Sequence, residues 1–225
     1  MNNFLELKNI SKSFNIEKKI KVLNKLSYNF KKGKIYSLMG PSGSGKSTLL
    51  NIISLIDRPT NGLIKFDKNQ INFNENNKND IFRAKKIGIV YQQNNLLPDF
   101  TALENLYLAS LSINDNKKMA ISRAEKLLKK IGLSNRSDHF PSQLSGGESQ
   151  RIAIARALIN DPDIILADEP TGSLDMKTAK GIFDLLYNQK NPNRLTIFAT
   201  HNRFFAKKAD YLLEITDGSI KTINA

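Results

Sequence analysis

Residues 40–48, GPSGSGKST, are the most informative stretch of this chain: three glycines, three serines and a threonine surround one lysine. Glycine reaches backbone dihedrals that are closed to other residues and lets main-chain N–H groups approach a ligand closely. Gly40, Gly45, Lys46 and Ser47 satisfy the pattern G-x-x-x-x-G-K-[ST], in which backbone amides cradle phosphates. Lys46 would reach the outer phosphates and the Ser47 hydroxyl would bind Mg²⁺.

The sequence on either side of this phosphate loop (residues 40–48) fits an anion site. Residues 34–39, KIYSLM, predict a short buried strand, and residues 48–53, TLLNII, predict the opening turns of a helix whose N-terminus faces the anion. An ordinary glycine-rich turn needs neither flank, so we interpret the loop as a nucleotide site. The predicted phosphate-binding residues are Gly40, Pro41, Ser42, Gly43, Ser44, Gly45, Lys46, Ser47 and Thr48.

Length and composition limit the classes of protein to which the chain can belong. A chain of 225 residues can bury one large core with an inserted subdomain, and the absence of cysteine excludes disulfides and thiolate metal sites. We expect neither a secretory signal nor a membrane-spanning segment, since no apolar run approaches the roughly 18 residues that a span requires.

The formal net charge is +13, and residues 1–34 hold nine lysines against two glutamates. We favour a solvated, lysine-rich sheet edge as the explanation, with attraction to anionic lipid head groups as the alternative. No nucleic-acid partner is expected, because aromatic residues are not interleaved with these lysines.

Hydrophobic patterning predicts an α/β nucleotide-binding core interrupted by a helical insertion. Before the insertion we expect antiparallel strands at 5–10 and 22–30, a turn at 59–62, a strand at 63–66, an exposed asparagine-rich loop at 69–80 and a buried strand at 87–91. Helices are expected within 92–160. After them we expect parallel strands at 164–167 and 195–199 with a helix at 178–187 between them, and a closing hairpin at 211–223. The apolar stripe expected to face the core of the insertion is Met119, Ala120, Ala124, Leu127, Leu128 and Ile131.

Two adjacent carboxylates, Asp168 and Glu169, end the apolar strand at residues 164–167. Acids at the end of a buried strand are costly unless a cation or ligand needs them, although a helix cap is a common alternative. Beside a phosphate loop, Asp168 is expected to hold Mg²⁺ and Glu169 to polarise an attacking water.

A second anion site is predicted at residues 144–148, LSGGE, which we call the signature segment. Ser145, Gly146 and Gly147 open an amphipathic helix whose free N–H groups face its N-terminal end. One small domain has no evident use for two phosphate cradles, so we expect the second to close on a nucleotide held by another copy.

The phosphate loop, the signature segment, residues 165–170 (ILADEP), residues 173–175 (SLD) and residues 200–201 (TH) occur in the order found in ABC transporters. With these motifs the chain resembles an ABC-transporter nucleotide-binding subunit over nearly its whole length. The resemblance implies a single ABC ATPase domain, 1–225, with a RecA-like P-loop NTPase core and an N-terminal antiparallel β subdomain at 1–91 and 161–225. A helical signature subdomain is implied at 92–160.

The resemblance also implies ATP and Mg²⁺ as ligands and an ATP-dependent, head-to-tail homodimer that sandwiches ATP between the phosphate loop and the partner's signature segment. The residues implied in catalysis are Glu169, His201, Lys46 and Gln92, and those implied at the metal are Ser47, Gln92 and Asp168. Beyond the phosphate loop, the residues implied to contact the nucleotide are Phe14, Ser145, Gly146, Gly147, Glu148 and Asp175. Phe14 would stack on adenine, and Asp175 would lie at the dimer seam. His201 taken alone would more often be a structural core histidine, but its place in the segment ATHN at a strand end favours the implied role of a switch histidine that contacts the γ-phosphate. His139 has no such context and is expected to be structural.

Residues 96–105, LLPDFTALEN, and 167–175, ADEPTGSLD, are similar to the ATPases of lipoprotein-releasing systems. Macrolide-exporter and cell-division ATPases are the alternatives, and Ser149, Ser173 and Asn202 depart from the lipoprotein-releasing pattern. The similarity implies an ATP-hydrolysing subunit that powers lipoprotein release and lies peripherally on the cytoplasmic face of the inner membrane.

Two integral membrane permease subunits are implied to contact residues 92–100. The apolar run Leu96, Leu97, Pro98 and Phe100 could be this docking surface or could pack under the helical subdomain. Other classes fit less well: DNA-repair ATPases need a long coiled coil, translation-type ABC proteins need two modules in one chain, and metabolite kinases lack LSGG.

Overall fold

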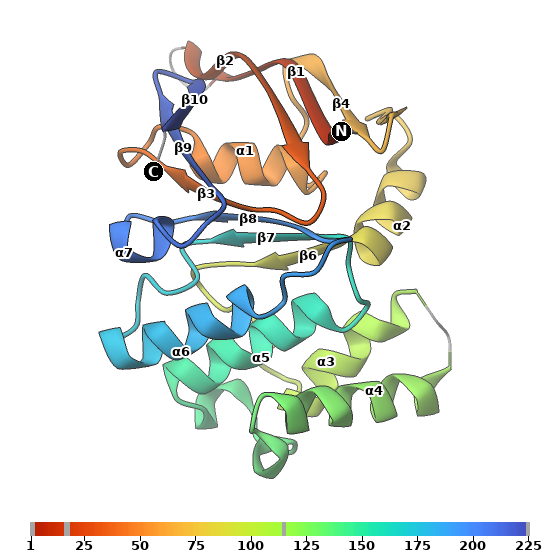
Figure 1. Cartoon of the computed structure of the whole chain (residues 1–225). Helices are drawn as coiled ribbons and strands as arrows, with labels where there is room; N and C mark the ends of the chain where they lie inside the picture. The colour runs from red at the N-terminus through yellow and green to blue at the C-terminus, as the bar shows by residue number, and fades with distance from the viewer. Residues whose placement is uncertain (1–2, 16–18, 114–115, 224–225) are drawn as a thin grey trace.

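The computed structural model describes residues 3–15, 19–113 and 116–223, which form two sheets and a group of helices (Figure 1). The larger sheet has the strand order β10-β9-β3-β8-β7-β6. Its strands are β3 (Ile35–Met39), β6 (Ile87–Val90), β7 (Ile164–Asp168), β8 (Leu195–Ala199), β9 (Tyr211–Thr216) and β10 (Ser219–Ile223). All pairs are parallel except β9 with β10, which form the expected closing hairpin. The carboxyl ends of β3, β6, β7 and β8 therefore meet at one edge.

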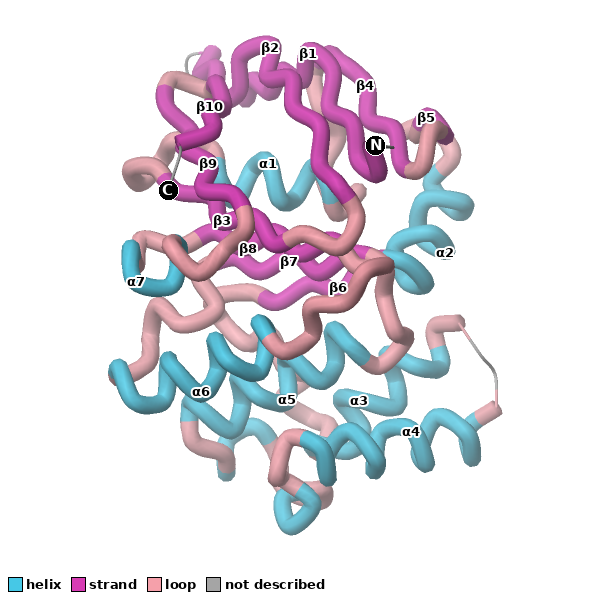
Figure 2. The backbone as a smooth tube through the Cα atoms, viewed as in Figure 1, coloured by secondary structure: helices cyan, strands magenta, loops and turns pink. Residues whose placement is uncertain are grey.

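The smaller sheet is antiparallel and has the order β2-β1-β4-β5. Its strands are β1 (Asn3–Asn15), β2 (Lys19–Lys31), β4 (Asn61–Phe66) and β5 (Asn69–Gln70). Helix α1 (Lys46–Ile53) lies between the two sheets (Figure 2) and buries its apolar residues, including Leu49 and Ile52, against both. This shared core fixes the start of α1 against both sheets.

The helical insertion contains α3 (Ala102–Leu111), α4 (Lys117–Lys130) and two short 3₁₀ turns, η1 (Ser134–Arg136) and η2 (Pro141–Gln143). Helix α5 (Gly146–Leu158) joins it to the core, because Ile154 packs with the sheet cluster whereas Ile152 and Ala155 pack with the helical cluster. Of the predicted stripe, Ala120, Ala124, Leu128 and Ile131 are buried and Leu127 packs against them. The prediction that Met119 faces the core is wrong, because this residue, at the start of α4, is 52% exposed.

The predicted loop at 69–80 is also wrong. Residues Asn69–Gln70 form β5, and α2 (Asn76–Lys86) begins inside the asparagine-rich stretch. Asparagine favours turns, but here tertiary contacts outweigh that propensity. Phe82 packs on Phe66 with ring centroids 5.0 Å apart, and Arg83 donates to the Leu55 carbonyl at 3.2 Å.

The remaining helices are α6 (Met176–Tyr187), between β7 and β8 as expected, and α7 (Arg203–Ala206). Lys8, Lys21, Lys25 and Lys32 are exposed on or beside the antiparallel sheet, as a solvated sheet surface requires. Glu17 and Lys18 of the basic segment lie outside the described residues. Throughout the part of the chain that the structure describes, no helix is both long and apolar enough to cross a membrane.

Candidate active site

The phosphate loop joins β3 to α1 in a conformation that only glycine adopts easily. Gly40, Gly43 and Gly45 have φ values of 147°, 77° and 100°. A Cβ on Gly40 would lie 2.4 Å from the Ile215 carbonyl oxygen, and a Cβ on Gly45 would lie 2.8 Å from Leu23 Cδ2. The loop thus needs its glycines both for backbone dihedrals and for close packing.

Lys46 is the first residue of α1, and its side chain folds back over the loop. Its Nζ donates to the carbonyl oxygens of Gly40 at 2.9 Å and Pro41 at 3.0 Å, and the residue is only 7% exposed. A nearly buried ammonium at a helix N-terminus makes this loop an electropositive cradle for an anion.

A cavity of about 350 Å³ opens over the loop at the carboxyl edge of the larger sheet. It brings together residues that are separated by more than 150 positions in the sequence. Its lining residues are Val22, Ser42, Gly43, Gly45, Lys46, Ser47, Thr48, Gln92, Asp168, Glu169 and His201. Of the predicted loop residues, Gly40, Pro41 and Ser44 lie outside this lining; Gly40 and Pro41 line a neighbouring cavity with His201.

Glu169 directs its carboxylate to His201. Nε2 of His201 is 3.0 Å from Oε1, and the His201 main-chain N–H donates to Oε2 at 3.2 Å. Among the described residues Oε1 has no well-aligned hydrogen-bond donor, although its side chain is only 12% exposed. Glu169 also has a φ of 45°, an unfavourable conformation for a residue with a Cβ. A buried carboxylate oxygen that lacks an aligned donor and lines a cavity is suited to accept a proton from a water there.

The oxygen atoms available for a metal also suit Mg²⁺. The Ser47 hydroxyl, the Gln92 amide and the Asp168 carboxylate line the same cavity. The described residues contain no group of three or more His, Cys, Asp or Glu side chains that could hold a metal. Mg²⁺ does not require one, since it binds through one or two carboxylates together with substrate phosphates and water.

The signature segment lies outside this cavity and forms the start of α5. Ser145 caps the helix, accepting from the Glu148 N–H at 3.2 Å, while Glu148 accepts from the Ser145 N–H at 2.8 Å. Hydrogen bonds from the Ser145 backbone and from Arg136 lower the pKa of Glu148 to about 2. Both carboxylate oxygens of Glu148 thus have partners within the chain, and the S-x-x-E spacing predicts this capping role.

Asp175 also lies outside the cavity, where it caps α6 by accepting from the N–H groups of Lys177 at 3.0 Å and Thr178 at 3.1 Å. Hydrogen bonds from Thr178 lower the pKa of Asp175. The start of α6 packs on the signature segment, because a Cβ on Gly147 would lie 2.6 Å from Thr178 Cγ2. The signature segment is therefore in contact with the start of the helix that Asp175 caps.

Phe14 does not line the cavity but lies beside it on the antiparallel sheet. It pairs with Ile20, two residues before the lining residue Val22 on β2, and it is 38% exposed. Val22 and Lys12 were not predicted from the sequence as site residues, and Lys12 Nζ lies 4.9 Å from the Phe14 ring centroid. The i, i+2 spacing of Lys12 and Phe14 on a strand is the signal that could have found the second of these.

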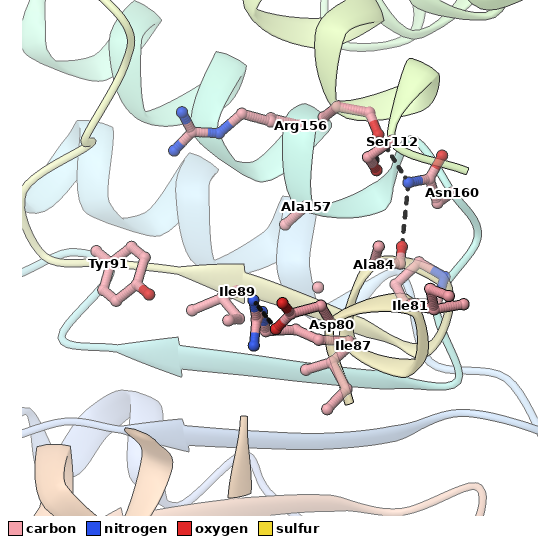
Figure 3. A pocket seen from close by; sticks show the side chains of 14 residues that line it. Asp80, Ile81, Ala84, Ile87, Ile89, Tyr91, Ser112, Arg156, Ala157 and Asn160 are labelled. Carbon is pink, nitrogen blue, oxygen red and sulfur yellow. Dashed lines mark hydrogen bonds and ion pairs between the residues drawn. The ribbon is translucent and has the colours of Figure 1, made fainter. Parts of the chain in front are cut away.

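A larger cavity of about 550 Å³ lies between α2, β6, α3 and α5 (Figure 3). Asn160 spans it, donating to the carbonyls of Ala84 at 3.1 Å and Ala109 at 3.0 Å, and Tyr91, the neighbour of Gln92, forms part of its wall. Arg156 donates to the carbonyls of Asn94 and Asn95, which ties the segment after Gln92 to α5.

The apolar run that follows is packed at one residue and exposed at two others. Leu96 packs against the helical cluster, whereas Leu97 and Phe100 are 43% and 38% exposed. Asn105 holds this loop by donating to the carbonyls of Leu97 and Phe100. His139 contacts Arg136 Nη1 at 3.2 Å, consistent with a structural role.

The family model described as "ABC transporter" matches residues 23–172. The chain is 43% identical over 221 residues to the lipoprotein-releasing system ATP-binding protein LolD of Rickettsia bellii, covering 97% of this chain and 98% of that protein. It is 39% identical over 219 residues to the macrolide export ATP-binding/permease protein MacB of Mannheimia succiniciproducens, covering 97% of this chain but 34% of that protein.

Among solved structures, the chain is similar to the dimeric ATP-binding cassette MJ0796 in a post-hydrolysis state bound to ADP and Pi. The TM-score is 0.89 at 38% identity, with 98% of this chain and 99% of that chain covered. This similarity confirms the predicted fold class, including the antiparallel β subdomain.

Proposed function

Since this chain belongs to the ABC transporter family of ATP-binding proteins, we propose that it powers the release of lipoproteins from the inner membrane. It is an ABC-type ATPase, which hydrolyses ATP to ADP and phosphate. The proposal on cargo rests on the 43% identity to a LolD that extends over both chains almost completely.

In the proposed mechanism the phosphate loop and Lys46 bind the phosphates of ATP through backbone N–H groups and the ammonium. Glu169 would orient the attacking water through its carboxylate and accept its proton, while the main-chain N–H and Nε2 of His201 hold that carboxylate in place. The family resemblance further implies that His201 contacts the outer phosphate. Mg²⁺, which Ser47, Gln92 and Asp168 would hold, neutralises phosphate charge when it is bound.

The proposed active form is a homodimer in which each signature segment completes the partner's site. The observation that supports it is the separation within one chain: Lys46, Asp168 and Glu169 share a cavity, whereas Ser145–Glu148 start a helix outside it. The dimeric cassette with a TM-score of 0.89 gives further support.

The proposed membrane partners are two permease subunits that dock on residues 92–100. Leu97 and Phe100 are exposed on a loop whose neighbouring residues are anchored to α5 and α3. Such a loop can transmit a movement at Gln92, which lines the nucleotide cavity, to a helix docked beside it. The proposed location is therefore peripheral, on the cytoplasmic face of the inner membrane.

The second candidate function is macrolide export, supported by the 39% identity to a MacB ATPase region.

The lipoprotein-release proposal is tested by depleting the protein from cells that depend on it and then separating their inner and outer membranes. We expect lipoproteins to accumulate in the inner membrane and recovery with the wild-type chain but not with Glu169→Gln. Normal lipoprotein sorting with a loss of drug efflux or a block in septation would overturn the cargo proposal but not the ATPase.

A further inference from the structure

Lys12 lies beneath Phe14 with its ammonium in a fixed position. Nζ donates to Asp57 Oδ1 at 2.6 Å and to the Arg58 carbonyl at 2.9 Å, and it lies 4.9 Å from the centroid of the Phe14 ring. The Lys12 side chain is only 13% exposed. A partly dehydrated cation over an aromatic face is attracted by the ring quadrupole more strongly than one in bulk water.

The partner of Lys12 is in turn attached to the helix that begins at the phosphate loop. The Asp57 N–H donates to the Asn51 carbonyl in α1 at 3.1 Å, so its carboxylate has a defined place relative to Lys46 at the start of the same helix. Strand β1 is also hydrogen-bonded to the segment that follows α1, because the Ser13 N–H donates to Thr60 Oγ1 at 3.0 Å. A continuous set of contacts thus runs from the phosphate loop through α1, Asp57 and Lys12 to the Phe14 ring.

We propose that Lys12 is a positioning residue for the nucleobase: it fixes the Phe14 ring at a set distance from the phosphate loop and occupies one face, so that a purine stacks on the other. This inference rests on the proposed binding of the adenine base by Phe14. A ring that is already oriented loses less conformational entropy when the base binds, so the protein binds the base more tightly. The phosphates bind elsewhere and gain nothing from Lys12.

The test compares a ligand with a base to one without a base, using ADP and inorganic pyrophosphate with Mg²⁺ on the full-length protein. Calorimetric titration of Lys12→Met should show ADP binding weakened by about 3- to 10-fold, with pyrophosphate binding unchanged. Lys12→Arg should restore ADP affinity, since a guanidinium can keep both the carboxylate pair and the ring contact. Lys8→Met removes the same charge from an exposed position on the same strand and should change neither ligand.

Phe14→Ala separates this inference from its premise. It should weaken ADP selectively, and adding Lys12→Met to it should cause no further loss, because the ring that Lys12 positions is gone. Asp57→Asn leaves Lys12 in the chain but removes the charge of its ion-pair partner, so it should cause a smaller selective loss of ADP affinity.

Equal weakening of both ligands by Lys12→Met, or an undiminished effect of that substitution in the Phe14→Ala background, would overturn the role of Lys12. No selective effect of Phe14→Ala would overturn base stacking at Phe14, while continued ATP hydrolysis would leave the ATPase function intact. A wild-type protein that binds neither ligand would count against the nucleotide site itself.

Discussion

Glu169 and His201 meet at the edge of the larger sheet, where Nε2 of His201 lies 3.0 Å from Oε1 of Glu169 and the His201 N–H donates to Oε2. The two residues follow β7 and β8, which are adjacent parallel strands in the register Asp168 with Ala199. The pairing of these strands, and not the sequence spacing of 32 residues, places the carboxylate against the imidazole.

Glu169→Gln tests the carboxylate directly. The amide keeps the size of the side chain but cannot accept the proton of the attacking water, so hydrolysis should fall by about 100-fold or more while ATP still binds. Phosphate release measures the first effect, and gel filtration with ATP should show a stable dimer. Turnover close to that of the wild-type protein would remove Glu169 from the catalytic role.

Lys46→Ala and Ser145→Arg test whether the two phosphate cradles act between chains. Each substitution alone should abolish ATPase activity, since every dimer then lacks the same half of both sites. A mixture should regain activity, because a mixed dimer contains one site with an intact loop and an intact signature segment. Differently tagged chains would establish that mixed dimers form; if they form and stay inactive, each chain completes its own site.

Replacement of both Leu97 and Phe100 by glutamate tests the docking surface. Both side chains are exposed, so the fold and ATP binding should persist, whereas burying unpaired charge against a partner costs several kcal/mol. When mixed with membranes that contain the partner subunits and sedimented, the double variant should remain in the supernatant. As a control, Met119→Glu alters an apolar residue on α4 that is more exposed than either and should leave sedimentation unchanged.

The Glu148 cap predicts a particular pH dependence of stability. Its pKa is lowered from 4.5 to about 2 in the folded chain, so its contribution is complete above pH 4.5 and is lost as the pH falls toward 2. Glu148→Gln should therefore lower the free energy of unfolding by about 1 kcal/mol at pH 7 and by less at pH 3. Urea unfolding at the two pH values measures the difference, and an equal loss at both would exclude the charge as its origin.

Gly88 on β6 and Gly181 on α6 allow a matched test of close packing, because only the first lacks room for a Cβ. A Cβ on Gly88 would lie 2.2 Å from the Ala157 carbonyl oxygen, whereas Gly181, exposed on α6, has nothing within 4 Å of that position. Gly88→Ala should destabilise the protein by about 1–3 kcal/mol through overpacking. Gly181→Ala should stabilise it by about 0.5–1 kcal/mol, because alanine favours the helix. Thermal unfolding of both variants should show shifts of opposite sign.

Sequence alone determined the elements whose signals are local. The phosphate loop needs its glycines at particular dihedrals, and its neighbours form the expected strand and helix. The uninterrupted apolar runs of β7 and β8 required burial on both faces, which a parallel sheet provides. The family resemblance rested on the same segments, because each motif is a short contiguous stretch.

Features that depend on contacts between distant residues could be known from the folded chain alone. The tertiary structure turned an asparagine-rich stretch into α2 through Phe66 and Phe82, and it left Met119 exposed although helical spacing placed it in the core stripe. It also placed Lys12 against Asp57 and Phe14, a set of contacts that joins β1 to the turn after α1. Local periodicity fixes which face of a segment is apolar, but the free energy gained by a long-range contact depends on the partner that the fold brings to that face.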